Sequence, residues 1–227
     1  MPIDAMKTIC ISLGGSVISR NEGYNFAYLK GFSGIIERHK ESKFVIVTGG
    51  GAVSRMLVSS AKSHVNNNYA LDQIGIMVTR VNALVLSEII SGAIFVEDIK
   101  DAKTALLGGN IAVMGGLLPG ITTDAVTVLA CEALQSRLLI NVSSDGYLYS
   151  KNPRYGNAKP IKKADYDLLI NRANEEDARL PGTNFIFDSI AGKLAKRSGI
   201  VLKFVDENLA ELEKAINGKS HNGTTIG

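Results

Sequence analysis

The sequence predicts an α/β fold in which helices cover both faces of a largely parallel sheet. Short continuous runs of Val, Ile and Leu alternate along the chain with longer stretches of helical periodicity. These runs lack the apolar–polar alternation of a half-exposed strand, so both faces of the sheet should be buried. A chain of 227 residues is long enough for such a fold with a full core.

The elements follow in order along the chain. We expect strands at residues 7–14, 43–49, 93–98, 110–116, 136–143 and 199–205. Helical periodicity occupies residues 25–40, 52–65, 72–91, 98–107, 123–136, 187–198 and 207–217. The segment 147–185 is less regular, and we interpret it as a hairpin (147–162), a short helix (165–173) and a mobile polar loop (174–184). No internal repeat or low-complexity tract stands out, and we treat residues 1–227 as a single domain.

Composition excludes several classes of protein. The net charge of +3 is too slight, and its basic residues too scattered, for a dedicated nucleic-acid binder. No stretch approaches the roughly 18 apolar residues of a membrane span, and the N-terminus lacks the apolar core of a signal peptide. Cys10 and Cys131 lie in apolar segments and are expected in the core, and the three histidines are too far apart for a histidine-rich metal site. We therefore expect a cytoplasmic protein without nucleic-acid or membrane partners.

Glycines follow three of the expected strands. Gly14-Gly15, Gly49 to Gly51 and Gly115-Gly116 stand where strands give way to helices, with Gly120 nearby. One glycine pair serves any tight turn. Three sets at the edge where open α/β sheets bind ligands indicate backbone amides brought close to a polyanion.

Two stretches sharpen this prediction. In VTGGGAVSR, three glycines precede a helix, and Arg55 stands one turn into that helix, where it can reach back to an anion or simply face solvent. In LPGITTDAV, Gly120, Thr122, Thr123 and Asp124 precede a thoroughly apolar helix. A helix cap would need only one such polar residue. We interpret Asp124 as a fixed carboxylate beside a phosphate site that orients cations.

The first glycine turn, ISLGGSV, contains no cation. Position 12 is a serine, and the nearest lysine, Lys7, lies at the far end of the same strand. Lys193, in FDSIAGKLAKRSGI, extends from a mostly apolar helix; taken alone, this pattern favours a surface lysine.

Taken together, these segments resemble the amino acid kinase superfamily, and within it the archaeal-type UMP kinases. The resemblance runs from Thr8 to Ile226 and rests on LGGSV, VTGGGAVSR, DQIGIMVTRVNA, VMGGLLPGITTDAV, the DG…Y…NP hairpin, FDSIAGKLAKRSGI and HNGTTI. It implies a three-layer αβα sandwich with a mostly parallel sheet of about eight strands. It also implies reversible transfer of the ATP γ-phosphoryl group to UMP, with Mg²⁺ carried by ATP. UTP inhibition and a homohexamer are implied as well.

The resemblance assigns the N-terminal half to UMP and assembly, and the C-terminal half to ATP. The implied UMP-binding residues are Gly50, Asp72, Leu118, Pro119, Gly120, Ile121, Thr122, Thr123 and Asp124. The implied ATP-binding residues are Gly15, Ser16, Gly51, Arg55, Ser143, Tyr149 and Asn152. The implied catalytic residues are Lys193, Asp124 and Arg55.

The sequence departs from the family pattern at three points. Ser12 stands where many members have a lysine, so the positive charge is expected from Lys193, Arg55 and Mg²⁺. Asn152 stands where an aspartate is usual, and Tyr149 matches the family tyrosine when counted from Pro153 but not when counted from Asp145-Gly146.

Two alternatives stay open. A related phosphate-monoester kinase, such as isopentenyl phosphate kinase, would carry a histidine after the second glycine turn, where this chain reads GGGAVSRM. A non-catalytic nucleotide or oxyanion binder is favoured only by the absent lysine. For assembly, helix 52–65 is expected at the interface because Met56, Leu57, Val58 and Ala61 exceed what one buried face needs.

Overall fold

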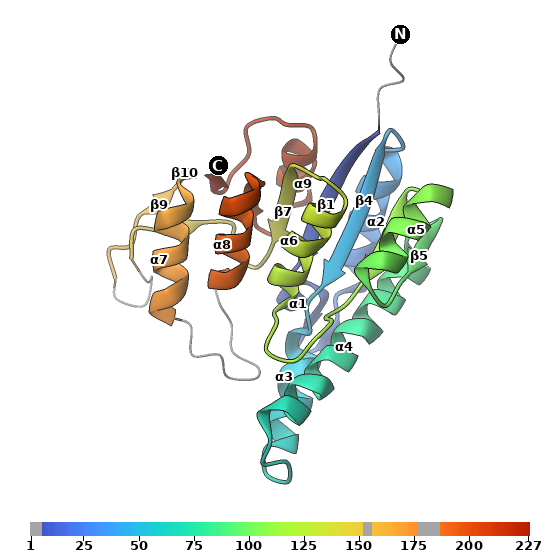
Figure 1. Cartoon of the computed structure of the whole chain (residues 1–227), viewed down its shortest axis with the longest axis vertical. Helices are drawn as coiled ribbons and strands as arrows, with labels where there is room; N and C mark the ends of the chain where they lie inside the picture. Colours follow the sequence, from blue (N-terminus) through green and yellow to red (C-terminus); the bar gives the residue numbers. More distant parts are fainter. Residues whose placement is uncertain (1–5, 152–155, 177–186) are drawn as a thin grey trace.

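The computed structural model describes residues 6–151, 156–176 and 187–227, which form one eight-stranded sheet with helices on both faces (Figure 1). The strands lie in the order β10-β12-β11-β7-β1-β4-β6-β5. Their bounds are β1 Lys7–Leu13, β4 Ser42–Thr48, β5 Ala93–Phe95, β6 Ile111–Met114, β7 Leu138–Val142, β10 Lys163–Ala164, β11 Val201–Val205 and β12 Thr225–Ile226. The pair β11–β12 is antiparallel and the other neighbours are parallel. The expected α/β fold is confirmed.

Strand alternation divides the core into two apolar clusters. On β1, Ile9 and Ile11 pack in one cluster and Cys10 packs in the other. The first cluster lies under α2 (Phe26–Arg38), α4 (Asn68–Ile89) and α9 (Leu209–Ile216). The second lies under α5 (Ile99–Gly108), α6 (Thr123–Ala133), α7 (Tyr166–Glu176) and α8 (Ser189–Ser198). By the same alternation Ser12 faces the second layer, which contains α6.

Capping side chains decide where several helices begin. Asn67 accepts a hydrogen bond from the Tyr69 amide, so α4 begins four residues before the expected start at residue 72. Asp188 caps α8, which therefore begins at Ser189 rather than at 187. The helix expected over 165–173 continues to Glu176, so the first part of the expected polar loop is helical, and the part at 177–184 lies outside the described residues.

The carboxyl end of β1 leads into small elements that the sequence pattern did not predict. These are α1 (Gly15–Ile18) and the antiparallel pair β2 (Ser19–Arg20) and β3 (Gly23–Tyr24). After β4 the chain forms α3 (Gly51–Ala61), which ends four residues before the expected position 65. The hairpin in 147–162 is present as β8 (Leu148–Tyr149) paired with β9 (Pro160–Ile161), and residues 152–155 between them are not described.

The helix α4 meets the length and apolar composition of a membrane span, contrary to the expectation that no stretch would. It is a core helix instead. Ala83, Leu86 and Ile90 belong to the first apolar cluster, and α4 packs against α3, β4, β5 and β6. The stacking of this helix on the sheet explains its apolar character.

Candidate active site

Three backbone turns meet at the carboxyl edge of the sheet. The Gly14 amide donates to Val142 O (2.7 Å), and the Gly49 amide donates to Leu13 O (2.8 Å). A Cβ added to Gly15 would lie 1.9 Å from the Gly51 nitrogen, so only glycine permits this approach. Gly51 has a φ of +67°, in the left-handed region that favours glycine. The first two glycine sets are therefore packed backbone to backbone, at the place where β1 and β4 lie side by side.

Asn82, on α4, fixes the orientation of the second glycine turn. Its fully buried side-chain amide donates to Gly49 O (2.7 Å) and to Gly50 O (3.2 Å). The Tyr24 hydroxyl donates to Asn82 Oδ1 at 2.6 Å. Because both carbonyl groups are tied back to α4, the turn is held in one conformation. The sequence pattern did not single out this role, which a buried asparagine in an apolar helix could have signalled.

The same helix holds the loop that contains Gly115, Gly116 and Gly120. Asp72 Oδ2 accepts a hydrogen bond from the Gly120 amide at 2.8 Å. Arg80 Nε donates to Gly116 O (3.3 Å), and the Gly116 amide donates to Thr79 Oγ1 (2.6 Å). The structure therefore brings Asp72 to the loop 117–123, in which Leu118 is 63% exposed and Pro119, Ile121 and Thr123 are partly buried.

Thr122 joins the starts of α6 and α8. Its hydroxyl oxygen caps α6 by accepting from the Ala125 amide at 3.2 Å. The hydroxyl also donates to Asp188 Oδ2, and Asp188 in turn accepts the Ile190 amide at 2.6 Å as the cap of α8. Two helix N-termini, each with a partial positive charge, thus converge near the site.

Asp124 lies between this junction and the central strands. Its Oδ1 accepts hydrogen bonds from Ser12 Oγ (2.7 Å) and from Asn141 Nδ2 (3.2 Å). Burial raises the pKa of Asp124 from 3.8 to about 6; the Ser12 hydroxyl opposes this shift and the nearby Asp188 carboxylate adds to it. The expected fixed carboxylate is thus beside the first turn, held by neutral donors.

The two expected cations lie on the helices α3 and α8. Arg55 is partly buried on α3 and Lys193 is exposed on α8. Among the described residues, neither has a salt bridge or a side-chain hydrogen bond, whereas Lys196 and Arg197 on α8 pair with Asp167 and Glu132. No group of three or more His, Cys, Asp or Glu side chains that could hold a metal lies in the described part of the chain.

The residues expected on the nucleotide side are less closely grouped. Gly15 and Ser16 begin α1, and Ser143 follows β7 and donates to Asp145 O at 2.6 Å. Tyr149 is in β8, where its ring lies edge-on to Tyr147 at 6.4 Å. Asn152 lies outside the described residues.

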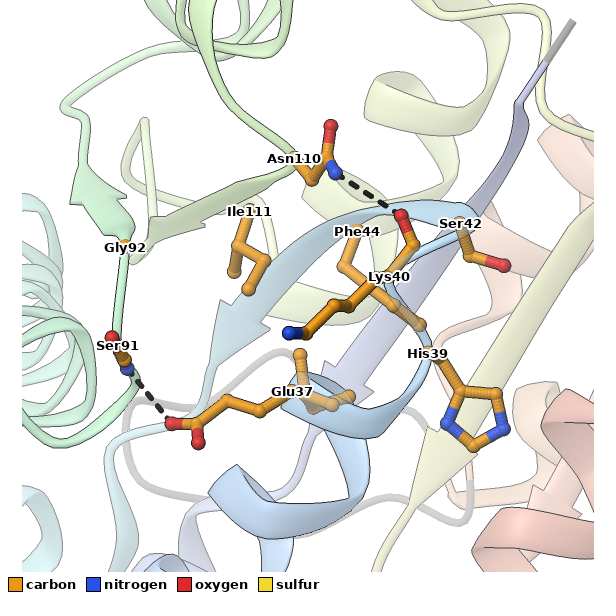
Figure 2. A pocket seen from close by; sticks show the side chains of 10 residues that line it. Glu37, His39, Lys40, Ser42, Phe44, Ser91, Gly92, Asn110 and Ile111 are labelled. Atoms are coloured by element: carbon orange, nitrogen blue, oxygen red, sulfur yellow. Dashed lines mark hydrogen bonds between the residues drawn. The ribbon is translucent and has the colours of Figure 1, made fainter.

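A cavity of about 330 Å³ lies at the opposite, amino edge of the sheet (Figure 2). Ser42 and Phe44 of β4, Ile111 of β6 and the end of α2 line it. Glu37 Oε1 accepts from the Ser91 amide, and Asn110 Nδ2 donates to Lys40 O. Several of its polar groups thus bond within the fold, and the cavity is separate from the carboxyl-edge cluster.

Comparison with known proteins places this arrangement in a family. The model of the amino acid kinase family matches residues 7–206. A uridylate kinase from Thermoplasma acidophilum is 37% identical over 215 residues, covering 93% of both chains. One from Methanoculleus marisnigri is 36% identical over 212 residues, covering 88% of this chain and 87% of the relative.

A solved structure shows the same fold. The crystal structure of uridylate kinase from Archaeoglobus fulgidus superposes with a TM-score of 0.85 and 29% identity, covering 96% of this chain and 99% of the other. Sheet order, glycine turns and near-complete sequence matches agree, and the chain belongs to the amino acid kinase family.

Proposed function

We propose that this protein is a UMP kinase that reversibly transfers the γ-phosphoryl group of ATP to UMP, giving UDP and ADP. An oxygen of the UMP phosphate attacks the γ-phosphorus, and the bond to the oxygen bridging β- and γ-phosphorus breaks. The observation that carries the proposal is the junction of Asp72 with the loop at Gly120, beside the packed glycine turns. The full-length similarity to uridylate kinases supports it.

The two halves divide the work. UMP would lie against Gly50, Asp72 and the segment Leu118 to Asp124. Asp72 would then exchange its hydrogen bond from the Gly120 amide for bonds from the ribose hydroxyls, and the loop would close on the nucleotide. ATP would lie across Gly15, Ser16, Gly51, Ser143, Tyr149 and Asn152. We treat residues 1–227 as one domain with a UMP-binding half and an ATP-binding half.

Phosphoryl transfer needs positioning and charge neutralisation more than covalent chemistry. Lys193 and Arg55 are cations with no competing ion pair among the described residues, so both are available to the transferring group. Asp124 would orient them. Mg²⁺ carried by ATP would neutralise part of the phosphate charge.

A coupled assay of ADP formation tests the proposal. Purified protein with ATP, Mg²⁺ and UMP should produce ADP, and omission of UMP or of Mg²⁺ should abolish this. Isopentenyl phosphate in place of UMP should give little product. Turnover of that acceptor without turnover of UMP, or nucleotide binding without any turnover, would replace the proposal with one of the alternatives.

Assembly, inhibition and location belong to the same proposal. On α3 and α4, Met56, Leu57, Met77, Val81 and Leu84 are each more than 40% exposed, which leaves an apolar face on the acceptor half. Val58, expected on that face, is buried instead. We place the subunit contact of a homohexamer on this face, with UTP as inhibitor and the cytoplasm as location. A monomer in sedimentation would contradict the assembly.

A further inference from the structure

Two neutral side chains converge on one oxygen of Asp124. Ser12 Oγ and Asn141 Nδ2 both donate to Asp124 Oδ1, at 2.7 Å and 3.2 Å. Ser12 and Asn141 are neighbours in register on β1 and β7, and both are almost fully buried. Strand alternation turns both toward α6, which carries Asp124. Two adjacent strands therefore provide one hydrogen-bonding platform for a single carboxylate.

All the donors that hold the Asp124 carboxylate are neutral. The backbone of Asp188 also donates a hydrogen bond to the Asp124 carboxylate, and among the described residues Asp124 forms no salt bridge. The Asp124 side chain is partly exposed at the carboxyl edge of the sheet. A lysine in place of Ser12 would form an ion pair that cancels the charge of the carboxylate. Hydroxyl and amide donors fix its position while the charge stays available.

We propose that Ser12 and Asn141 are positioning residues: they hold one oxygen of Asp124 in place without cancelling its charge, so that the ionised carboxylate can orient the reacting groups. The proposal rests on the proposed kinase function, because the reacting groups are those of phosphoryl transfer.

Electrostatics give this platform a measurable consequence. Burial is the main cause that raises the pKa of Asp124 to about 6, and hydrogen bonds from the Ser12 hydroxyl, the larger, and from the Asp188 backbone oppose it. The like charge of Asp188, on the segment before α8, raises it further. The charged groups on the other elements around the site include Arg55 of α3, Asp72 and Arg80 of α4 and Lys193 of α8, while β1 and β7 contribute the neutral Ser12 and Asn141. Without Ser12, Asp124 would be protonated over more of the neutral range.

The competing interpretation is that Ser12 only ties β1 to α6. A structural tie and a positioning role differ in pH dependence. Loss of a structural tie lowers activity at every pH. Loss of a hydrogen-bond donor to the ionised Asp124 carboxylate instead moves the acidic limb of the pH profile of kcat/KM, because that profile reports pKa values of the free enzyme.

The experiment compares Ser12→Ala, Ser12→Thr and Ser136→Ala with the parent between pH 5 and pH 9. Ser136 is a matched control, because its buried hydroxyl bonds Thr8 O (2.8 Å) at the other end of β1. Ser12→Ala should move the acidic limb of kcat/KM for UMP about one pH unit higher, a tenfold change in proton affinity. Ser12→Thr, which keeps the hydroxyl, should restore it, and Ser136→Ala should leave the limb in place.

A second measurement does not depend on turnover. Carbon-13 NMR of the Asp124 carboxyl, assigned with Asp124→Asn, should show a higher titration midpoint in Ser12→Ala and in Asn141→Ala than in the parent. An unchanged midpoint and an unmoved acidic limb would overturn the positioning role while leaving the kinase function intact. A protein that titrates as expected but never phosphorylates UMP would instead overturn the proposed function.

Discussion

Glu37 and Asp124 lie at opposite edges of the sheet and are held in the same way, yet their acidity changes in opposite directions. Glu37 Oε1 accepts the Ser33 hydroxyl (2.7 Å) and the Ser91 amide (2.8 Å). Both hydrogen bonds lower the pKa of Glu37, and the bond from the Ser33 hydroxyl has the larger effect. Asp124 also receives two neutral donors on one oxygen, but burial and the charge of Asp188 outweigh them and its pKa rises to about 6.

The difference shows what distinguishes the two edges. At the amino edge, hydrogen bonds satisfy a carboxylate that water still solvates, and the result is local stability (Figure 2). At the carboxyl edge, desolvation and like charge outweigh the hydrogen bonds, and the carboxylate is less stable in its charged form. Perturbation of this kind is typical of functional sites. The predictions below test this contrast.

The largest expected effect is on catalysis. Lys193→Ala should lower kcat by about 10²–10³, because the transferring phosphoryl group loses one preorganised cation that stabilises it. The KM for UMP should change far less. Steady-state kinetics measure both. Lys40→Ala, which removes a lysine at the amino-edge cavity, is the control and should keep the parent kcat. A Lys193→Ala enzyme within about threefold of the parent kcat, roughly 0.6 kcal/mol in barrier, would remove Lys193 from catalysis.

The second effect is on stability and has opposite signs at the two edges. The folded pKa of Asp124 is raised, so its contribution to stability is present in acid and is lost as the pH rises through about 6. Asp124→Asn should therefore be more stable than the parent at pH 8, by up to about 3 kcal/mol for two pKa units, and the gain should vanish near pH 4.

Glu37→Gln should behave in the reverse sense. The folded pKa of Glu37 is lowered, so its contribution is present at neutral pH and is lost in acid. The variant should unfold at a lower temperature than the parent at pH 7, and the difference should shrink below pH 4. Thermal unfolding of Asp124→Asn and Glu37→Gln across pH measures both changes in stability. If both variants were stabilised, or both destabilised, at neutral pH, the contrast between the two edges would be wrong.

A smaller effect concerns the acceptor. Asp72→Asn should weaken UMP binding by about 1–3 kcal/mol, because charge-assisted bonds to the ribose hydroxyls become neutral, and should leave ATP affinity nearly unchanged. The Gly120 amide can still donate to the remaining carbonyl oxygen, so the loop should stay in place. Calorimetry with each nucleotide decides the matter, and equal losses for both would place Asp72 outside the acceptor site.

The smallest effect is expected at Tyr24, whose hydroxyl bonds the Asn82 side chain that holds the second glycine turn. Tyr24→Phe removes the hydrogen bond to Asn82 but keeps the ring contact with Phe26, at 5.6 Å between ring centres. It should cost about 1 kcal/mol of stability and raise the KM for UMP only slightly. Denaturant unfolding and kinetics measure these changes. A large loss of kcat would mean that Tyr24 acts directly on the reacting groups rather than through Asn82.

The sequence predicted the layers and the principal strands of the fold, and its glycine turns lie at the carboxyl edge of the sheet. Short continuous runs rich in Val and Ile, such as residues 43–49, are typical of strands covered on both faces, and glycine turns after strands occur where backbones approach closely. The position of Asp124 at a helix start also follows from local pattern, because the cap at Thr122 and the apolar helix are adjacent in the chain.

Contacts between distant residues needed the tertiary structure. Ser12 lies 112 residues from Asp124, and Asn82 lies 33 residues from Gly49, so no local pattern shows their bonds. The sequence left the first turn without a cation; the fold brings Ser12 and Asn141 to Asp124. The local chain determines which residues form strands and turns, because backbone geometry is a short-range property. Which side chains share a carboxylate, and how far its pKa moves, depends on burial and on charges that only the packed structure brings together.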